Sequence, residues 1–255
     1  MFYYLNSERI QTLIIKFSER AAQAGVNPQH LQEFKIPLPP LEVQQEIVDE
    51  LEGYQKIIDG CKQVVENYKP TIDIDPSWEM VGLGEVIKLS SGQGLTQKDF
   101  VIGDYDVYGG NGITGKHNEY FLEDSTIVIG RVGAYCGAVH ITSDNCWVTD
   151  NGLYVKKFLK EVQINYLYVI LNQINLNKYS KAGGQPSISQ SDILELEIPL
   201  PSINTQKEIV LKIEEERKVI EGNKKLIEIY TQKIQNKINK VWGENQQTLS
   251  QSRLK

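Results

Sequence analysis

Residues 36–68, IPLPPLEVQQEIVDELEGYQKIIDGCKQVVENY, occur a second time as residues 198–230, IPLPSINTQKEIVLKIEEERKVIEGNKKLIEIY. The two stretches align without a gap at an offset of 162 residues, and fifteen positions are identical. The identical positions include the opening IPLP and one glutamine, Gln44 in the first copy and Gln206 in the second. A repeat of this length around a long unrepeated insert indicates that one supersecondary unit is used twice.

Each copy of the repeat is predicted to be a long helix. In the first copy two prolines precede a helix over residues 41–69, and Pro70 ends it. The second helix is expected to continue to about Trp242. Apolar residues recur every seven positions in both copies, which is typical of helices that pack along one seam. These residues are Leu51, Ile58 and Val65 in the first helix, and Ile213, Ile220, Ile227, Ile234 and Val241 in the second.

The two helices differ in charge. Residues 41–69 hold seven acidic and three basic side chains, whereas residues 204–240 hold six acidic and nine basic ones. Opposite net charge favours pairing of the unlike helices over pairing of either with itself. The insert must return the chain to the start of the second helix, so an antiparallel coiled coil is expected. Ordinary solvated helix faces are the alternative.

Residues 76–200 have a different character, with frequent glycines and aromatics and with short apolar runs broken by turn signals. They predict a compact mixed domain, so the fold class is α+β: one globular domain plus two long helices. The expected strands cover residues 81–89, 126–132, 136–141 and 152–155, the expected helix covers 164–179, and 109–112 is expected to be a loop or tight turn.

Composition narrows the class of protein. No apolar run approaches the roughly 18 residues of a membrane span, and the N-terminus lacks the features of a signal peptide. Three widely spaced cysteines fit a reduced, cytoplasmic protein. A zinc site at Cys136, His140 and Cys146 is the alternative to buried or idle thiols, but the spacing is not standard and a fourth ligand is missing. The net charge of −6 argues weakly against nucleic acid.

Catalytic motifs are absent from the sequence. There is no phosphate-binding loop, no His-Glu-x-x-His, no nucleophile elbow and no Asn/Asp-Pro-Pro-Tyr/Phe motif of adenine methyltransferases. A non-catalytic binding module without a cofactor is therefore favoured over an enzyme.

Four motifs follow one another in the insert: YGGNGITG at residues 108–115, IGRVGAYCG at 129–137, WVTD at 147–150 and GQPSI at 184–188. Each is weak alone, but their order, together with the repeated IPLP and helix, resembles the DNA specificity subunits of type I restriction-modification systems. The resemblance covers nearly the whole chain.

The resemblance implies a function. In that family, two target-recognition domains alternate with two conserved long helices, and the helices form an antiparallel coiled coil that acts as a spacer. Each recognition domain reads one half of a split target in double-stranded DNA. Methyltransferase (M) subunits flank the specificity subunit for adenine methylation, and restriction/motor (R) subunits join for cleavage.

The chain departs from that full pattern and resembles a half-sized or truncated subunit. Expected parts are a recognition-domain remnant at residues 1–40, spacer helices at 41–70 and 203–243, a complete recognition domain at 71–202 and a disordered tail at 244–255. Two copies are then expected to associate, with inverted half-sites. The apolar face expected to dock on the second copy comprises Phe2, Tyr3, Tyr4, Leu5, Ile10, Leu13, Ile14 and Phe17.

Nine side chains are candidates for DNA contact. Arg131 can bind guanine or phosphate, with a surface salt bridge as the alternative. Tyr108, Asn111, Lys116 and His117 belong to the glycine-rich segment, where asparagine can read adenine; the alternative is a plain turn with Tyr108 in the core. The polar residues after the predicted helix suit phosphate, with a solvated loop as the alternative. They are Lys178, Lys181, Gln185 and Ser187.

Two other functions remain open at this point. One is a scaffold protein that uses the coiled coil without reading DNA. The other is the specificity subunit of a fused nuclease-methyltransferase system, with the same DNA role and different partners.

Overall fold

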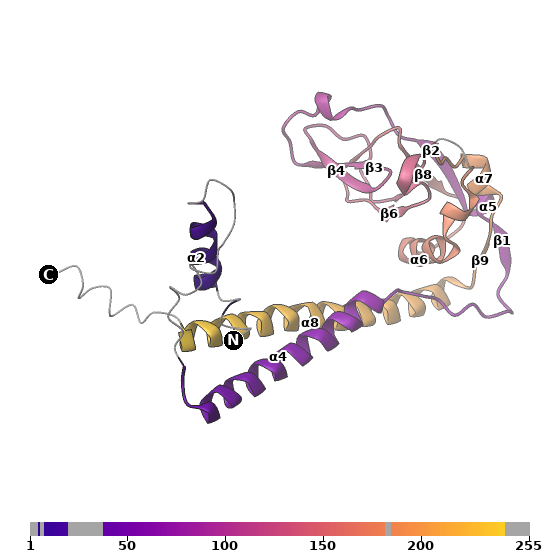
Figure 1. The fold of residues 1–255 in the computed structure, drawn as a ribbon. Coiled ribbons are helices and arrows are strands. Elements are labelled where there is room, and N and C mark those ends of the chain that lie inside the picture. The colour runs from indigo at the N-terminus through magenta and orange to yellow at the C-terminus, as the bar shows by residue number, and fades with distance from the viewer. Residues whose placement is uncertain (1–4, 6–7, 20–37, 182–184, 243–255) are drawn as a thin grey trace. The chain divides into compact units, whose positions relative to one another are not determined.

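The computed structural model describes residues 5, 8–19, 38–181 and 185–242, which divide into two compact units (Figure 1). One unit comprises residues 1–68 and 217–255, and the other comprises residues 69–216. The expected tail at 244–255 lies outside the described residues, as does most of the expected remnant at 1–40. Of the apolar face predicted in that remnant, Ile10 is buried and Leu5 is exposed.

The described part of the first unit holds helix α2 (Glu8–Glu19), helix α4 (Leu41–Asn67) and the greater part of helix α8 (Ile203–Trp242), whose residues are shared between the two units. Helix α4 begins directly after Pro40 and ends before Tyr68, whose backbone is extended. Both long helices therefore have nearly the bounds that the prolines and the apolar repeat predict.

Helices α4 and α8 pack against each other over part of their length, where Leu51, Ile234 and Val241 of the predicted apolar spacing take part. Ile47 and Leu51 of α4 form a buried cluster with Ile238 of α8. Further along α4, the ring of Tyr54 lies 5.4 Å from that of Tyr230. Because the α8 partner moves to lower residue numbers as α4 advances, the helices run in opposite directions where they touch. Glu50 and Lys237 form an ion pair beside this cluster.

Three antiparallel or mixed sheets form the second unit. Strands β1 (Met80–Gly82) and β9 (Glu197–Pro199) form a two-stranded sheet. The four-stranded sheet has the order β2-β8-β5-β6 and is antiparallel throughout. Its strands are β2 (Ile87–Ser91), β8 (Gly152–Phe158), β5 (Ile127–Gly130) and β6 (Val139–Ile141). The third sheet has the order β4-β3-β7, from β4 (Gly112–His117), β3 (Tyr105–Gly109) and β7 (Trp147–Val148).

Two predicted elements of this unit are interrupted. The strand expected over residues 81–89 is split into β1 and β2 by the short helix α5 (Leu83–Val86). The helix expected over 164–179 ends early, as α6 (Ile164–Ile174), because Asn175 adopts a left-handed backbone with φ of 59°. A 3₁₀ turn, η3 (Leu176–Tyr179), follows it. The other short helices are α7 (Gln190–Leu194), η1 (Gln97–Asp99) and η2 (Gly133–Tyr135).

The core of the second unit lies between the four-stranded sheet and α6. Tyr166, Leu167 and Ile170 of α6 are fully buried there, and the Tyr166 hydroxyl donates to the carbonyl of Pro199 at 2.9 Å. Val210 and Ile213 of α8 belong to the same core, so the first turns of α8 are part of this unit. The chain thus has mixed helices and strands, with a globular unit and long helices, as predicted. Over the described ranges, no helix is long and apolar enough to cross a membrane.

Candidate nucleic-acid interface

The glycine-rich segment forms the tip of the β3–β4 hairpin, as the predicted tight turn requires. Gly109 pairs with Gly112 across the hairpin, which leaves Gly110 and Asn111 as the two-residue loop. Gly112 has a φ of +84°, a conformation that glycine adopts without the penalty that a Cβ atom brings. The side chain of Asn111 at the tip is exposed to solvent.

The hairpin tip packs directly on the end of β5. A Cβ atom added to Gly130 would lie 2.3 Å from the carbonyl oxygens of both Gly110 and Tyr135. A Cβ atom added to Gly110, in the hairpin loop, would lie 3.4 Å from the carbonyl oxygen of Asn151. Backbone therefore meets backbone here, and the glycines of the sequence motifs are explained by this close approach.

Arg131 follows β5 at this junction. Its backbone N–H donates to the carbonyl of Asn151 at 2.9 Å, and its carbonyl accepts from the N–H of Ile188 at 3.0 Å. Its guanidinium is exposed and donates a long hydrogen bond of 3.4 Å to the hydroxyl of Ser91. Arg131 is the one arginine in the sequence between residues 69 and 216. Its backbone is fixed on both sides while most of its hydrogen-bonding capacity faces solvent.

The segment after η3 joins the same junction. The N–H of Gly133 donates to the carbonyl of Pro186 at 2.9 Å, and the N–H of Lys181 donates to that of Ser187 at 2.8 Å. The Lys181 ammonium pairs with Asp192 at 3.4 Å. Hydrogen bonds from Ser189, with a smaller contribution from Lys181, hold the pKa of Asp192 below its usual value. Gln185 is exposed, and its side-chain nitrogen lies close to Gly133.

These loops create one surface from four separate parts of the chain, called the polar loop surface below. Five of its six residues were predicted from sequence. Asn151 was missed, although it directly follows the WVTD motif at 147–150; it is exposed, and its carbonyl links the hairpin tip to Arg131. The surface comprises Asn111, Arg131, Asn151, Lys181, Gln185 and Ser187.

Four other predicted residues lie outside this surface. Tyr108 is buried in a small core, and its hydroxyl accepts the N–H of Ser143 at 2.9 Å. His117 is also buried, and its Nδ1 accepts the N–H of Val101 at 3.1 Å. Neither side chain faces solvent, so both are left out of the candidate interface.

The other two residues are exposed lysines. Lys116 lies five residues along β4 from Asn111, or about 16 Å at the usual strand rise, and it pairs with Asp106 at 3.0 Å. Lys178 lies on η3 next to Asn177, whose side chain donates to the carbonyl of Cys136 at 2.8 Å. Lys178 is therefore placed near the loop that follows Arg131, whereas Lys116 is not.

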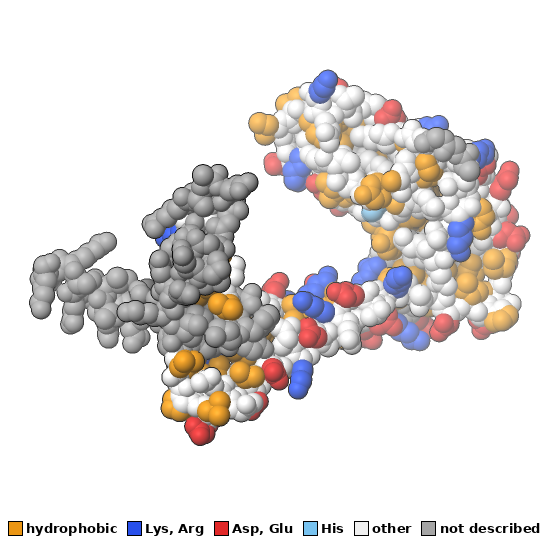
Figure 2. Space-filling view, in the orientation of Figure 1, with side chains coloured by type: hydrophobic (Ala, Val, Ile, Leu, Met, Phe, Trp, Pro, Cys, Tyr) orange, Lys and Arg blue, Asp and Glu red, His pale blue; other side chains and the backbone are white. Residues whose placement is uncertain are grey.

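On the side of the second unit that Figure 2 shows, charge is spread rather than concentrated. Figure 2 shows acidic and basic side chains interspersed on the visible side of the globular part, without a single basic patch. Arg131, Lys178 and Lys181 are exposed cations of this unit.

The three cysteines are buried, and His140 is half-buried. Burial raises the pKa of the Cys136 and Cys146 thiols, which disfavours the thiolate form that binds metal. Burial likewise lowers the pKa of His140. Within the described part of the chain, no group of three or more histidine, cysteine or acidic side chains is arranged to hold a metal ion.

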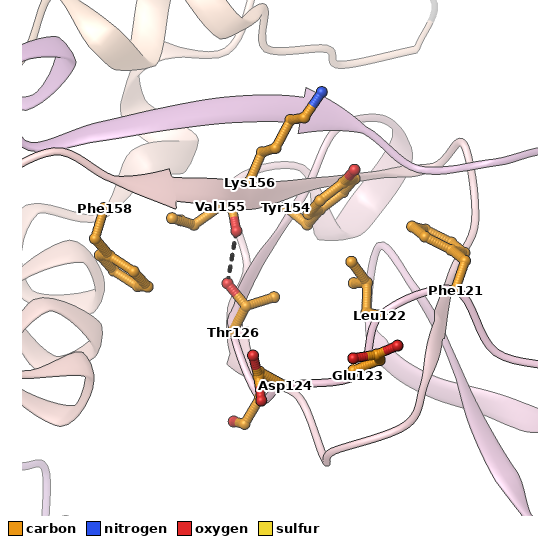
Figure 3. A pocket seen from close by; sticks show the side chains of 10 residues that line it. Phe121, Leu122, Glu123, Asp124, Thr126, Tyr154, Val155, Lys156 and Phe158 are labelled. Carbon is orange, nitrogen blue, oxygen red and sulfur yellow. Dashed lines mark hydrogen bonds between the residues drawn. The ribbon is translucent and has the colours of Figure 1, made fainter.

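A separate pocket of about 450 Å³ lies at the start of β5, whereas Arg131 follows the end of that strand (Figure 3). Phe121, Tyr154 and Phe158 provide aromatic walls, and the Thr126 hydroxyl donates to the carbonyl of Val155 at 2.8 Å within it. The pocket contributes no side chain to the polar loop surface.

The fold and the loop surface define a binding module: a globular unit with clustered loops, joined to a repeated long helix. A family model described as "Type I restriction modification DNA specificity domain" matches residues 1–67 and 76–239. The chain therefore belongs to this family, as the order of its sequence motifs predicted. Membership in a specificity family, rather than a family of catalytic subunits, also confirms the non-catalytic class expected from the sequence.

Individual relatives agree with this assignment. The chain is 30% identical over 129 residues to the type I restriction enzyme EcoprrI specificity subunit of Escherichia coli, a match that covers 49% of the chain and 32% of that relative. The chain thus spans about a third of the length of this relative.

Solved structures share the fold. A chain from a study of assembly and conformational transition in the type I R-M system is similar with a TM-score of 0.63 and 17% identity, over 94% of this chain and 69% of that one. The type I S subunit from M. genitalium is similar with a TM-score of 0.59 and 17% identity, over 95% and 72% of the two chains.

Proposed function

We propose that the chain is a DNA sequence-recognition component of a type I restriction-modification complex. The observation that carries the proposal is the family match, which extends over both the globular unit and the repeated helices. The E. coli relative is itself a type I specificity subunit. The chain would act without catalytic residues of its own, by positioning partner subunits on a target in double-stranded DNA.

The polar loop surface has the chemistry for reading bases. The exposed guanidinium of Arg131 can donate two parallel hydrogen bonds to guanine, and the amide of Asn111 can both donate to and accept from adenine. The exposed ammonium groups of Lys178 and Lys181 would contact phosphates beside the bases. Because the backbones of these loops are hydrogen-bonded to one another, the side chains start from a rigid platform, which reduces the entropic cost of binding.

The two long helices would form the antiparallel coiled coil that separates two recognition sites. Support comes from the opposed packing of α4 and α8, the Glu50–Lys237 ion pair and the opposite net charges of the two helices. Since the described residues form one strand-bearing globular unit, this spacer would join two half-sites when two copies associate. The two copies would read inverted half-targets.

The helices also carry matched surfaces for protein partners. Ile57 and Val64 of α4 are exposed, and so are Val219 and Leu226, which occupy the equivalent positions of the repeat in α8. Exposed apolar residues at equivalent positions on two helices suit two identical partners. We assign these surfaces to methyltransferase subunits, with motor-nuclease subunits joining through them for restriction.

The test is sequencing of methylated adenines in DNA from cells that carry the chain and its methyltransferase partner. A methylated, split target with two inverted half-sites is the expected result. The target should lose its methylation when Arg131 is replaced by alanine, while an exposed lysine remote from the surface, such as Lys157, tolerates the same change. Methylation that does not depend on the chain would refute the proposal. A monomer in light scattering, alone and with the partner, would refute the two-copy arrangement.

A further inference from the structure

A glutamine side chain holds the linker where it enters the globular unit. The linker that follows α4 enters this unit at Ile72, whose side chain is buried in the core. Gln173, in the last turn of α6, accepts the N–H of Ile72 at 2.8 Å and donates to its carbonyl at 3.0 Å. One amide therefore satisfies both backbone groups of one residue, as a neighbouring strand would.

A second glutamine holds the chain where it leaves. Gln206, in the first turn of α8, is 1% exposed. Its Oε1 accepts the N–H of Gln163 at 2.9 Å, and its Nε2 donates to the carbonyl of Pro201 at 2.9 Å. Because the amide is buried with both ends bonded, a substitution would leave buried backbone groups without a partner.

Both contacts converge on α6. Gln163 is the residue before its first turn and Gln173 lies in its last, so entry and exit are separated by about the length of the helix, roughly 15 Å. Helix α6 is itself immobilised, since Tyr166, Leu167 and Ile170 are buried in the core. Helix α6 is thus a fixed element to which the chain is hydrogen-bonded both where it enters the globular unit and where it leaves it.

The linker reaches α8 only through the buried core, where Ile72 belongs to the same cluster as Val210 and Ile213 of α8. Beside this cluster a cavity of about 330 Å³ is lined by Thr71, Ile72, Asp73 and Trp78 of the linker and by residues of α8 between 205 and 216. The linker position in this part of the unit therefore depends on the buried Ile72 and on the Gln173 amide.

Glutamine stands at both positions at the 162-residue offset, and one of the two pairs lies within the repeat itself. Gln44 is equivalent to Gln206, and its Nε2 donates to the carbonyl of Pro39 at 2.7 Å, the counterpart of the bond to Pro201. Gln11 occupies the position equivalent to Gln173. The bond to the preceding proline therefore recurs in both copies, whereas the amide of Gln11 donates to the carbonyl of Leu5 rather than to a linker residue.

We propose that Gln173 and Gln206 are positioning residues that set the spacer length between the two halves of the DNA target. This inference rests on the proposed function. Helix α8 has 40 residues and is about 60 Å long, so a tilt of about 5° at its first turn moves its far end by about 5 Å. That displacement exceeds the rise of about 3.4 Å per base pair. A small change in how Gln173 and Gln206 hold the chain thus alters the number of base pairs that the complex accepts between the two half-sites.

The test compares Gln173→Leu and Gln206→Leu with the wild-type chain in cells that contain its partner subunits, by sequencing of methylated adenines. The half-site bases stay the same, while methylation of targets with a spacer one base pair longer or shorter rises about tenfold, equivalent to ~1.4 kcal/mol of lost discrimination. Variants that keep the wild-type spacer at every target, even with less methylation, would overturn the proposal.

Two controls separate positioning from stability. Asn172→Leu changes a neighbouring exposed amide that bonds within α6, to the carbonyl of Tyr168, and it should keep the wild-type spacer. Val169→Ala removes buried methyl groups from the same helix and should lower methylation at all targets without widening the spacer range. If Val169→Ala widens the range of methylated spacer lengths as much as the glutamine variants do, the effect belongs to stability and the proposal is overturned.

A distance measurement on the chain itself distinguishes failure of the positioning role of the two glutamines from failure of the proposed function in DNA recognition. Spin labels at Lys157 of β8 and Lys240 of α8 report the distance distribution between the globular unit and the far end of α8. The distribution should widen in both glutamine variants and not in Asn172→Leu. If wild-type cells show no split target, the proposed function fails. The distance measurement still tests whether Gln173 and Gln206 fix α8 on the globular unit, and an unchanged width of the distribution in both variants would refute that role.

Discussion

Replacing Gly130 by alanine should damage both the stability of the globular unit and its recognition surface. The added Cβ would lie 2.3 Å from the carbonyl oxygens of Gly110 and Tyr135, whereas ordinary contacts begin near 3.4 Å. Both neighbours are backbone atoms that cannot rotate away, so each must move by about 1 Å. Overpacking of this kind costs about 1–3 kcal/mol. For a chain of this size, that corresponds to a lower Tm by roughly 2–12 °C.

The damage should also reach DNA binding, because Gly110 belongs to the hairpin that presents Asn111 and Arg131 follows Gly130 directly. Thermal unfolding gives the stability change, and fluorescence anisotropy of the complex on target DNA gives the affinity change at fixed salt. Gly94→Ala is the matched control, since nothing lies within 4 Å of a Cβ at that position. It should leave both quantities unchanged.

Two outcomes would contradict this reasoning. An unchanged Tm in Gly130→Ala would mean that the hairpin tip does not pack on β5 as closely as the structure has it. A lowered Tm with unchanged DNA affinity at a temperature where the protein is folded would mean that the hairpin tip and Arg131 do not belong to the DNA-contacting surface.

Four further outcomes are expected. Gly222→Ala, in α8 with open space around the added Cβ, should stabilise the helix by about 0.5–1 kcal/mol in chemical denaturation; destabilisation would contradict the open site. Hydrogen bonds from Lys237 and then Tyr54 lower the pKa of Glu50 from 4.5, so its stabilisation of the helix pair is present above pH 4.5 and lost as pH falls through the lowered pKa. Thermal unfolding across pH should therefore show an acid-dependent loss in the wild type that is smaller in Glu50→Gln. Tyr166→Phe should cost about 0.5–1.5 kcal/mol of unfolding free energy through its lost hydrogen bond, and no loss would mean that the bond is absent in solution. Arg131→Ala should weaken binding to target DNA by about 1–3 kcal/mol, and Arg131→Lys should restore binding to random DNA more than binding to the target; equal losses on both DNAs would assign Arg131 to phosphate alone.

Local signals were sufficient for much of the fold. The prolines before α4 and the seven-residue apolar spacing gave the bounds of both long helices, because helix formation depends on neighbours three and four residues apart. The GGNG run gave the hairpin tip for a similar reason, since turn conformation depends on two or three adjacent residues. The early end of α6 at Asn175 was missed, because apolar Leu176 and Tyr179 continue the helical spacing beyond it.

The candidate interface could be predicted only in part. Motif order pointed to Asn111, Arg131 and Ser187, but not to how they meet. Tyr108 and His117 resemble surface residues in a glycine-rich segment, yet the strand alternation of β3 and β4 and the packing of Trp147 against His117 turn them inward. Which face of a strand is buried depends on what packs there, and that information lies elsewhere in the chain.

By itself, the sequence determined that a helical unit occurs twice, that a mixed domain lies between the copies, and that the chain belongs to a specificity family. These properties follow from repetition, periodicity and motif order. Each of these signals lies within a short segment or in the comparison of two segments, so it does not require the folded chain. Only the tertiary structure decided that Arg131 meets Asn151 and Ile188, and that Gln173 and Gln206 bond to backbone groups 101 and 43 residues away. Such contacts exist only after the sheets have aligned and α6 has packed on them, because a hydrogen bond requires its partners within about 3 Å.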